Sequence, residues 1–285
     1  MDGRSLNVAV FDIDGTLAMM DKAKGTYEAL PGAIRTMDIC REAGMDVWAY
    51  TNGTFFTPEH YYPRLADAGI VLDEGRVMTP ASVAAHHLHQ TGHKRVMVLG
   101  AEGTVEPMRA AGFDVVLAGE ETGEDAHDVD AVLVGWARDF DLAQLTSMVE
   151  AVWAGAMPYS VSDAPYFAGA KGRVLGVSGS VGAMIAHTSG VEPTVIGKPA
   201  PWGLEMLSEQ TGVAARNMVV IGDDPKLEIR MGRVGGAITV GVTTGIAERD
   251  DFLSARPDWR ADIVLKSLEE FEAQDWLFAQ EESLT

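Results

Sequence analysis

The chain of 285 residues contains a single cysteine and no long hydrophobic run. Because Cys40 has no second cysteine to pair with, an internal disulfide is excluded, which is typical of a reducing compartment. The apolar runs, such as 8–11 and 219–221, fall far short of the roughly 18 residues of a membrane span. The N-terminal segment also lacks the apolar core of a secretory signal. We therefore expect a cytoplasmic protein with no membrane partner.

Positive charge is scarce as well. The 22 Lys and Arg residues face 42 Asp and Glu residues, which gives a formal net charge of −20. Such a chain repels nucleic acid and anionic membranes unless it has a basic patch, and no cluster of Lys and Arg is visible, so we exclude nucleic acid as a partner. Hydrophobic residues make up 47% of the chain, enough for a sizeable core, which excludes a disordered protein. Acidic globular proteins of this composition include many enzymes.

Strand-like and helix-like segments alternate along the chain. This alternation predicts an α/β fold with a parallel sheet covered by helices on both faces, in which ligands bind at the carboxyl ends of the strands. The acidic stretch 119–130 is predicted to be a solvated loop. The expected strands are 7–11, 46–50, 95–99, 114–117, 131–134, 218–221 and 237–242, and the expected helices are 31–43, 57–68, 79–90, 142–154, 180–188, 202–210 and 227–234.

Two aspartates directly follow the first predicted strand. Asp12 and Asp14 are two residues apart, so their carboxylates point the same way, and Gly15 permits a tight turn. Two like charges this close are unfavourable unless a cation or a shared proton offsets them. Mg²⁺, which takes one or two carboxylates plus waters, suits the pair. An isolated Asp-x-Asp is often a plain turn, but the longer string VAVFDIDGTL is far more specific.

Polar residues follow three further apolar segments. Thr51 and Asn52 follow strand 46–50, where a hydroxyl and a backbone N–H can donate to phosphate oxygens, although Asn-Gly by itself is a common turn. Lys198 lies between glycine and proline, where it can neutralise phosphate or carboxylate charge. Asp223, after strand 218–221, is placed to complete a metal site with the first motif.

The order of these motifs resembles the haloacid dehalogenase superfamily of phosphohydrolases: Asp-x-Asp-Gly-Thr, Thr-Asn, Lys and Gly-Asp, each at a strand end. Their separations resemble the branch with a large α/β cap between the second and third motifs. That branch includes nitrophenyl-phosphatase-like, pyridoxal phosphate and nucleotide or sugar phosphatases. The resemblance implies a Rossmann-like parallel-sheet core in two parts, 1–78 and 192–285, and an inserted α/β cap domain, 79–191.

The resemblance also implies a chemistry for the carboxylates. Asp12 would be the nucleophile that forms an aspartyl-phosphate. Asp14 would act as general acid and then as general base. Mg²⁺ would be bound by Asp12, by Asp14 through its backbone carbonyl, and by Asp223. The implied activity is Mg²⁺-dependent hydrolysis of small phosphate monoesters, such as sugar, nucleotide or pyridoxal phosphates, so the partner would be a small phosphorylated metabolite.

The remaining motif residues would support this centre. By resemblance, Thr51, the Asn52 amide and Lys198 would hold the phosphoryl oxygens. Asp224 would lie beside the metal ligands, and Glu228 would hold a metal-bound water, although the branch usually has Asp where Glu228 stands.

The cap segment departs from the branch at two further points. Ala137 replaces a common acidic residue, and Val161-Ser162 replaces a common Thr-Asn pair, so the usual substrate preference does not transfer. The branch often dimerises through its caps, which suggests a homodimer. The residues that we expect to contact the leaving group are Arg138, Asp139, Asp163 and Tyr166.

Three other functions stay open from the sequence. A phosphotransferase or mutase could use the same motifs with another acceptor, and a non-catalytic protein could bind a phosphometabolite. A dinucleotide-dependent oxidoreductase is weakly suggested by a glycine-rich turn near 176–182, but the spacing is GxxGxxG and close packing is the simpler interpretation. His86, His89 and His93 have a spacing that suits a transition metal, or they form the polar surface of a helix.

Overall fold

The computed structural model describes residues 5–21, 24–120, 128–169 and 172–273. It divides into a first unit of residues 1–51, 59–78 and 198–285 and a second unit of residues 52–58 and 79–197. The segment 79–191, predicted as an insertion, falls inside the second unit, which also includes 52–58 and 192–197. The backbone therefore passes between the units four times, after residues 51, 58, 78 and 197.

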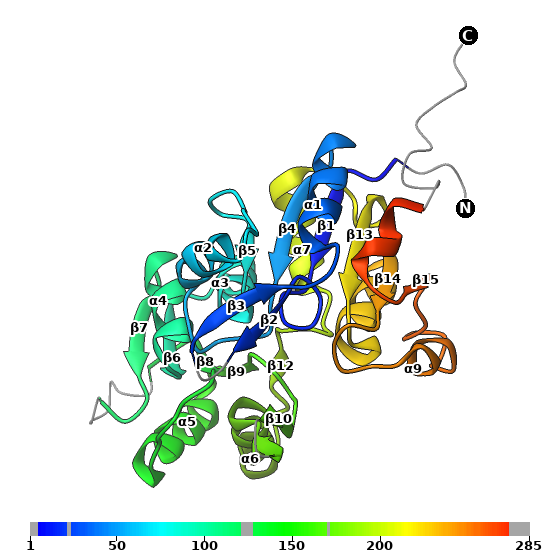
Figure 1. Cartoon of the computed structure of the whole chain (residues 1–285). Coiled ribbons are helices and arrows are strands. Elements are labelled where there is room, and N and C mark those ends of the chain that lie inside the picture. The colour runs from blue at the N-terminus through cyan, green and yellow to red at the C-terminus, as the bar shows by residue number, and fades with distance from the viewer. Residues whose placement is uncertain (1–4, 22–23, 121–127, 170–171, 274–285) are drawn as a thin grey trace. The chain divides into compact units, whose positions relative to one another are not determined.

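The first unit is built on a six-stranded sheet in which all strands are parallel (Figure 1). The short strand β1 lies in the interior of this sheet, between β13 and β4, and all four of its residues are buried. A strand buried on both faces is continuously apolar, as in VAVF. In sheet order the strands are β15 (Ile263–Leu265), β14 (Ile238–Val242), β13 (Met218–Gly222), β1 (Val8–Phe11), β4 (Asp46–Tyr50) and β5 (Val77–Met78).

Helices accompany this sheet, and the expected ones are present. In α1, the buried residues Ala33, Met37 and Cys40 recur at helical spacing and make the helix amphipathic, and α1 packs against β4. The helices are α1 (Ala33–Glu42), α2 (Pro58–Asp67), α7 (Trp202–Thr211), α8 (Arg230–Gly235) and α9 (Arg249–Leu253), with short turns η2 (Ala215–Asn217), η3 (Pro225–Ile229) and η4 (Leu268–Ala273).

A hairpin follows the first strand and was not predicted. Strands β2 (Ala18–Asp21) and β3 (Thr26–Ala29) pair antiparallel directly after the Asp12–Thr16 turn. In that turn the carbonyl of Ile13 accepts hydrogen bonds from the backbone N–H groups of Leu17 and Ala18, and Gly15 has a φ of 95°. Each strand has only four residues, which is too short for a clear periodic pattern.

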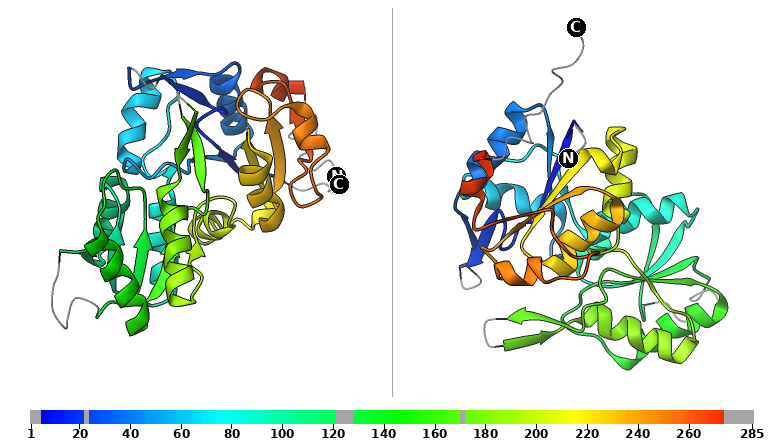
Figure 2. Two further views of the ribbon diagram at one scale, coloured as in Figure 1. Left: turned by 90° about the horizontal axis from the view of Figure 1, so that it is seen from below. Right: turned by 90° about the vertical axis from the view of Figure 1, so that its right-hand side faces the viewer.

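The second unit has its own five-stranded parallel sheet, so the predicted α/β class holds for both units. The two further views of Figure 2 show helices on both faces of this sheet. In sheet order the strands are β12 (Thr194–Val195), β9 (Met157–Ser160), β8 (Ala131–Val134), β6 (Arg95–Leu99) and β7 (Asp114–Leu117). The helices are α3 (Pro80–Gln90), α4 (Glu102–Ala110), α5 (Leu142–Ala154) and α6 (Val177–Ser189), and β10 (Tyr166–Gly169) pairs antiparallel with β11 (Gly172–Leu175).

Helix ends in the second unit follow local sequence signals. Asp141 accepts a hydrogen bond from the backbone N–H of Gln144 and begins α5, and Gly155, with a φ of 116°, ends it. The predicted helix 180–188 begins three residues earlier in the structure, at Val177. A Cβ on Gly176 would lie 1.9 Å from the carbonyl oxygen of Ala164, so this glycine allows close packing of the chain, as the simpler interpretation predicted.

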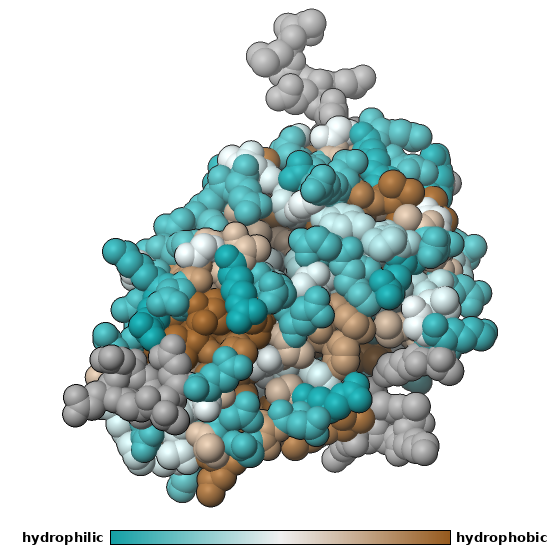
Figure 3. Space-filling view, turned by 90° about the vertical axis from the view of Figure 1, so that its left-hand side faces the viewer, coloured by the Kyte–Doolittle hydropathy of each residue, from teal (hydrophilic) through white to brown (hydrophobic). Residues whose placement is uncertain are grey.

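The surface is mostly hydrophilic on the face shown in Figure 3, with hydrophobic areas between the polar side chains. This agrees with the acidic composition. In the described part of the chain, no helix combines the length and the hydropathy needed to cross a bilayer. Cys40 is a free, fully buried cysteine.

Candidate active site

The candidate site begins at the carboxyl ends of three adjacent strands of the first unit. In the parallel register, Phe11 at the end of β1 lies opposite Ile221 of β13 and Ala49 of β4. The next residues along the three strands therefore emerge at one edge of the sheet. Asp12, Asp223 and Thr51 come together at this edge, although the sequence separates them widely, and all three are buried.

Lys198 joins this group from a distant part of the chain. Its Nζ lies 2.6 Å from Oδ1 of Asp12 and 2.7 Å from Oε1 of Glu228, and it donates to the backbone carbonyl of Tyr50 at 2.7 Å. The side chain is 1% exposed. Burial alone would lower the pKa of Lys198, but the two carboxylates more than offset burial and raise it, so the ammonium stays charged.

Glu228 therefore lies beside Lys198. The sequence analysis had predicted a role near the metal for Glu228 but no contact with this lysine. Its Oε2 accepts a hydrogen bond from the backbone N–H of Asp224 at 3.1 Å. Asp224 is half-buried and its Oδ1 accepts from the N–H of Lys226 at 2.7 Å, which begins the η3 turn. Its pKa is raised by burial and by the Glu228 charge.

The buried carboxylates repel one another strongly. Burial raises the pKa of Asp12. Lys198 lowers this pKa, whereas the charges of Glu228 and Asp223 raise it further. Burial and the Glu228 charge also raise the pKa of Asp223 to about 7, despite the hydrogen bond that its Oδ2 accepts from the N–H of Ile246 at 2.9 Å. Each shift means that the charged carboxylate lacks sufficient positive charge around it.

This donor set fits a divalent cation. When ionised, the three buried carboxylates of Asp12, Asp223 and Glu228 exceed the single Lys198 ammonium by two negative charges. Mg²⁺ prefers hard oxygen ligands and needs only one or two carboxylates when waters and carbonyls complete its shell. Within the described residues no three His, Cys, Asp or Glu side chains form a metal cluster by themselves, so backbone and water oxygens would be needed.

Two tyrosines near Asp14 escaped the sequence analysis. Tyr61 of α2 is 4% exposed and its hydroxyl is hydrogen-bonded to the Thr51 side chain. Burial and the charge of Asp14 raise the pKa of Tyr61 to about 12, and the same two causes raise the pKa of Tyr27 on β3. Asp14 itself is exposed. Both tyrosines reach the carboxylate through tertiary contacts, so no local pattern could have revealed them.

Tyr50 was also missed, although it is the last residue of a predicted strand. Its ring centroid lies 5.3 Å from Nζ of Lys198, and its buried hydroxyl has no hydrogen-bond partner among the described residues. Asn52, predicted to bind phosphate, belongs to the second unit, where a Cβ on Gly197 would lie 2.9 Å from its Oδ1.

The predicted leaving-group contacts are all exposed residues of the second unit. The Arg138 guanidinium lies 6.0 Å from the ring centroid of Phe55, and that ring packs against Trp136 at 4.4 Å. This half-exposed aromatic cluster, Phe55 and Trp136, was not predicted. Ala137 is buried. Arg138 and Asp139 lie in the loop after β8, Asp163 lies between β9 and β10, and Tyr166 is the first residue of β10.

His89 and His93 of the second unit contact different residues. Nε2 of His89 lies 2.9 Å from the carbonyl oxygen of Ala111, and its ring stacks on Phe113 at 4.2 Å. Nε2 of His93 lies 3.0 Å from the Tyr159 hydroxyl. These contacts agree with a packing role for two of the three histidines.

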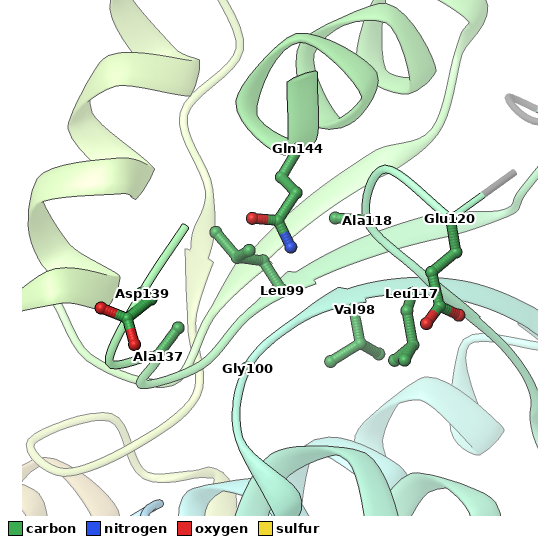
Figure 4. A pocket seen from close by; sticks show the side chains of 9 residues that line it. All are labelled: Val98, Leu99, Gly100, Leu117, Ala118, Glu120, Ala137, Asp139 and Gln144. Carbon is green, nitrogen blue, oxygen red and sulfur yellow. The ribbon is translucent and has the colours of Figure 1, made fainter. Parts of the chain in front are cut away.

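A small pocket in the second unit does not include any motif residue. It has a volume of about 110 Å³ and lies at the carboxyl ends of β6 and β7 (Figure 4). Asp139, one of the predicted contacts, lines it together with Gln144 of α5. Its other walls are formed by Val98, Leu99, Gly100, Leu117, Ala118, Glu120 and Ala137.

Comparison with known proteins places the chain among hydrolases. A family model described as haloacid dehalogenase-like hydrolase matches residues 9–114, and a second, described as HAD-hydrolase-like, matches residues 195–271. Dihydroxyacetone phosphatase of Corynebacterium glutamicum is 27% identical over 258 residues, which cover 90% of this chain and 87% of that protein.

Solved structures show the same fold. A hypothetical protein from Pyrococcus horikoshii is 25% identical, with a TM-score of 0.83 over 94% of this chain and 99% of that one. A glycerol phosphate phosphatase from Mycobacterium tuberculosis in complex with magnesium is 23% identical, with a TM-score of 0.79 over 94% of this chain and 76% of that one. The chain is an enzyme of the haloacid dehalogenase-like hydrolases.

Proposed function

We propose that this enzyme hydrolyses small phosphate monoesters through an aspartyl-phosphate on Asp12. The observation that carries the proposal is the pairing of Asp12 with the buried Lys198 at 2.6 Å, beside Asp223, at the carboxyl edge of the sheet. A buried carboxylate held by an ammonium is poised as a nucleophile toward an anionic ester. The relative named dihydroxyacetone phosphatase supports the class of substrate.

The proposed reaction has two steps. A carboxylate oxygen of Asp12 attacks phosphorus, the bond to the leaving oxygen breaks, and Asp14 gives that oxygen its proton, which releases the alcohol. Water then attacks the phosphorus of the aspartyl-phosphate, Asp14 takes the proton from the water, and Asp12 is restored as inorganic phosphate leaves. Lys198 and the Thr51 hydroxyl offset the charge of the phosphoryl oxygens in both steps, and we propose the same role for the Asn52 amide.

Asp12, Asp223 and the backbone carbonyl of Asp14 would hold Mg²⁺. When bound, the cation offsets the repulsion between the carboxylates and the anionic phosphate. The excess of two negative charges among the buried groups supports this assignment, as does the magnesium complex of a protein with the same fold. Asp224, through its backbone N–H, orients a neighbouring carboxylate.

The second unit would act as a cap that selects the leaving group. Arg138 with the aromatic cluster supports this, because a guanidinium beside an aromatic face suits a leaving group that has both an apolar part and an anionic part. We propose Asp139, Asp163 and Tyr166 as further contacts. A homodimer through this unit and a cytoplasmic location stay predictions, the first to be checked by light scattering.

The direct test is phosphate release. The wild-type enzyme should hydrolyse p-nitrophenyl phosphate with Mg²⁺ and not with EDTA, and a panel with dihydroxyacetone phosphate and glycerol phosphate should identify the preferred ester. Asp12→Asn should lose several orders of magnitude in kcat, while Asp67→Asn, an exposed aspartate of α2, serves as control. Full turnover by Asp12→Asn would overturn the proposal.

Product analysis separates the two alternatives. A phosphotransferase or mutase would transfer the phosphoryl group to an added alcohol in preference to water. A binding protein would retain a phosphorylated ligand without metal-dependent turnover. All the motif residues of a nucleophilic mechanism are present, which argues against a non-catalytic binding protein.

A further inference from the structure

Glu228 is bonded through both of its carboxylate oxygens. Oε1 lies 2.7 Å from Nζ of Lys198, and Oε2 accepts from the backbone N–H of Asp224 at 3.1 Å. The side chain is 3% exposed. A carboxylate with a partner on each oxygen in a buried site has a fixed orientation, so its position determines where its ionic partner lies.

The backbone around Glu228 is unusual. It lies in the π-helical turn η3, where the N–H of Ile229 reaches the carbonyl of Asp224 at 3.4 Å. Single π turns are rare in proteins, and those that occur often lie at functional sites. A Cβ on Gly222 would lie 2.3 Å from both Cβ and Cγ of Glu228. Glycine at position 222 therefore lets the stem of this side chain pack directly against the end of β13.

Three acceptors lie within hydrogen-bonding distance of the lysine ammonium. Two are the carboxylate of Glu228 and the carbonyl of Tyr50, at 2.7 Å each, and the third is Asp12 at 2.6 Å. The first two acceptors therefore fix the ammonium at a position from which it can also donate to the carboxylate that we propose as nucleophile.

We propose that Glu228 is a positioning residue that holds the Lys198 ammonium against Asp12, and that it does so through a carboxylate fixed at both oxygens. This inference rests on the proposed phosphatase function, because the effect of Glu228 is measured as a rate of phosphate ester hydrolysis. It differs from the expected role beside the metal, in which Glu228 would hold a metal-bound water.

Glu228→Asp separates the two roles. This variant keeps the charge and introduces the residue that the family resemblance would expect, but its carboxylate is one methylene shorter. If Glu228 positions the lysine, kcat for p-nitrophenyl phosphate should fall about tenfold or more, with KM and the calorimetric affinity for Mg²⁺ alone little changed. Full kcat, or a loss confined to Mg²⁺ affinity, would overturn the proposal.

A double-mutant cycle with Lys198→Met provides the second measurement. Glu228→Gln, which keeps the side-chain length, should lower kcat in the wild-type background and have little further effect when Lys198 is already methionine. Additive losses would show that Glu228 does not act through the lysine. If Glu228→Asp does not fold, the double-mutant cycle by itself tests whether Glu228 acts through Lys198. Glu205→Gln, on the exposed side of α7, controls for the loss of one negative charge.

These outcomes stay distinct from failure of the proposed function. An inactive wild-type enzyme would refute the phosphatase proposal itself. An active wild-type enzyme that Asp12→Asn inactivates, combined with fully active Glu228 variants, would refute only the positioning role.

Discussion

Nζ of Lys198 lies 2.6 Å from Oδ1 of Asp12 across 186 positions of sequence, and both side chains are buried. Removal of the ammonium by Lys198→Met leaves the buried carboxylates of Asp12 and Glu228 without its positive charge. We expect a loss of about 3–5 kcal/mol in the free energy of unfolding, because breaking a buried pair leaves uncompensated charge. Urea denaturation of metal-free protein measures this. Lys226→Met, an exposed lysine, is the control, and an equal effect of both variants would contradict the prediction.

Two features require glycine at position 15: its positive φ and the close approach of Asp223. The φ of Gly15 is 95°, and a Cβ there would lie 2.5 Å from Oδ2 of Asp223. Gly15→Ala should therefore displace the carboxylate and weaken Mg²⁺ binding in calorimetry, in addition to the backbone strain of about 1–2 kcal/mol. Gly25→Ala is a matched control, because Gly25 has a φ of 68° and nothing within 4 Å of a Cβ. It should show the strain alone, with Mg²⁺ affinity intact.

The raised pKa of Asp223 predicts how stability depends on pH. An ordinary aspartate has a pKa of 3.8, whereas in the fold this group has a pKa of about 7. The folded state therefore binds the proton more tightly, so the contribution is fully present below about pH 4 and is lost as pH rises through 7. Mg²⁺ should then raise the Tm of the protein more at pH 8 than at pH 5. Asp223→Asn should remove most of that difference, and a larger shift at pH 5 would contradict it.

Cys40 offers a probe of folding. Burial raises the pKa of its thiol to about 12, so almost no reactive thiolate exists at pH 8. Alkylation of the native protein should be far slower than alkylation in denaturant, and, since no other cysteine is present, labelling reports this site alone. Mass spectrometry over time gives both rates. Equal rates would mean that α1 opens freely.

Arg138 tests the selection of the leaving group. Arg138→Ala should raise KM about tenfold for esters with a second anionic group, because a charge-assisted hydrogen bond is lost, and should change p-nitrophenyl phosphate little. Arg109→Ala, an exposed arginine of α4, is the control. Equal effects on both kinds of ester would remove Arg138 from the proposed cap contacts.

The sequence predicted the strands and the motifs that follow them because buried parallel strands are short apolar runs. Asp12 and Asp223 each come directly after such a run, so the edge of the sheet where they meet follows from topology alone. The hairpin β2–β3 escaped prediction because four-residue strands have too few positions for a period. The contact of Glu228 with Lys198 escaped it as well, because a π turn changes the direction of a side chain without any local signature.

The interactions of two tyrosines could not be predicted from the sequence either. Tyr61 reaches Thr51 from α2, and Tyr27 approaches Asp14 from β3. Each contact depends on how separate elements pack in the folded chain. Periodicity gives the buried face of α2 but not which hydroxyl will find a partner there.

The position of β1 in the sheet has a consequence for protein synthesis. This strand is synthesised before β4 and β13 but lies between them, and β13 begins only at Met218. The continuous stretch 79–197 of the second unit is thus translated completely before β1 gains its later neighbour. During synthesis, the edge of β1 that later pairs with β13 therefore stays unpaired while the inserted stretch is made. A chain arrested before β13 should therefore be a ready substrate for chaperones.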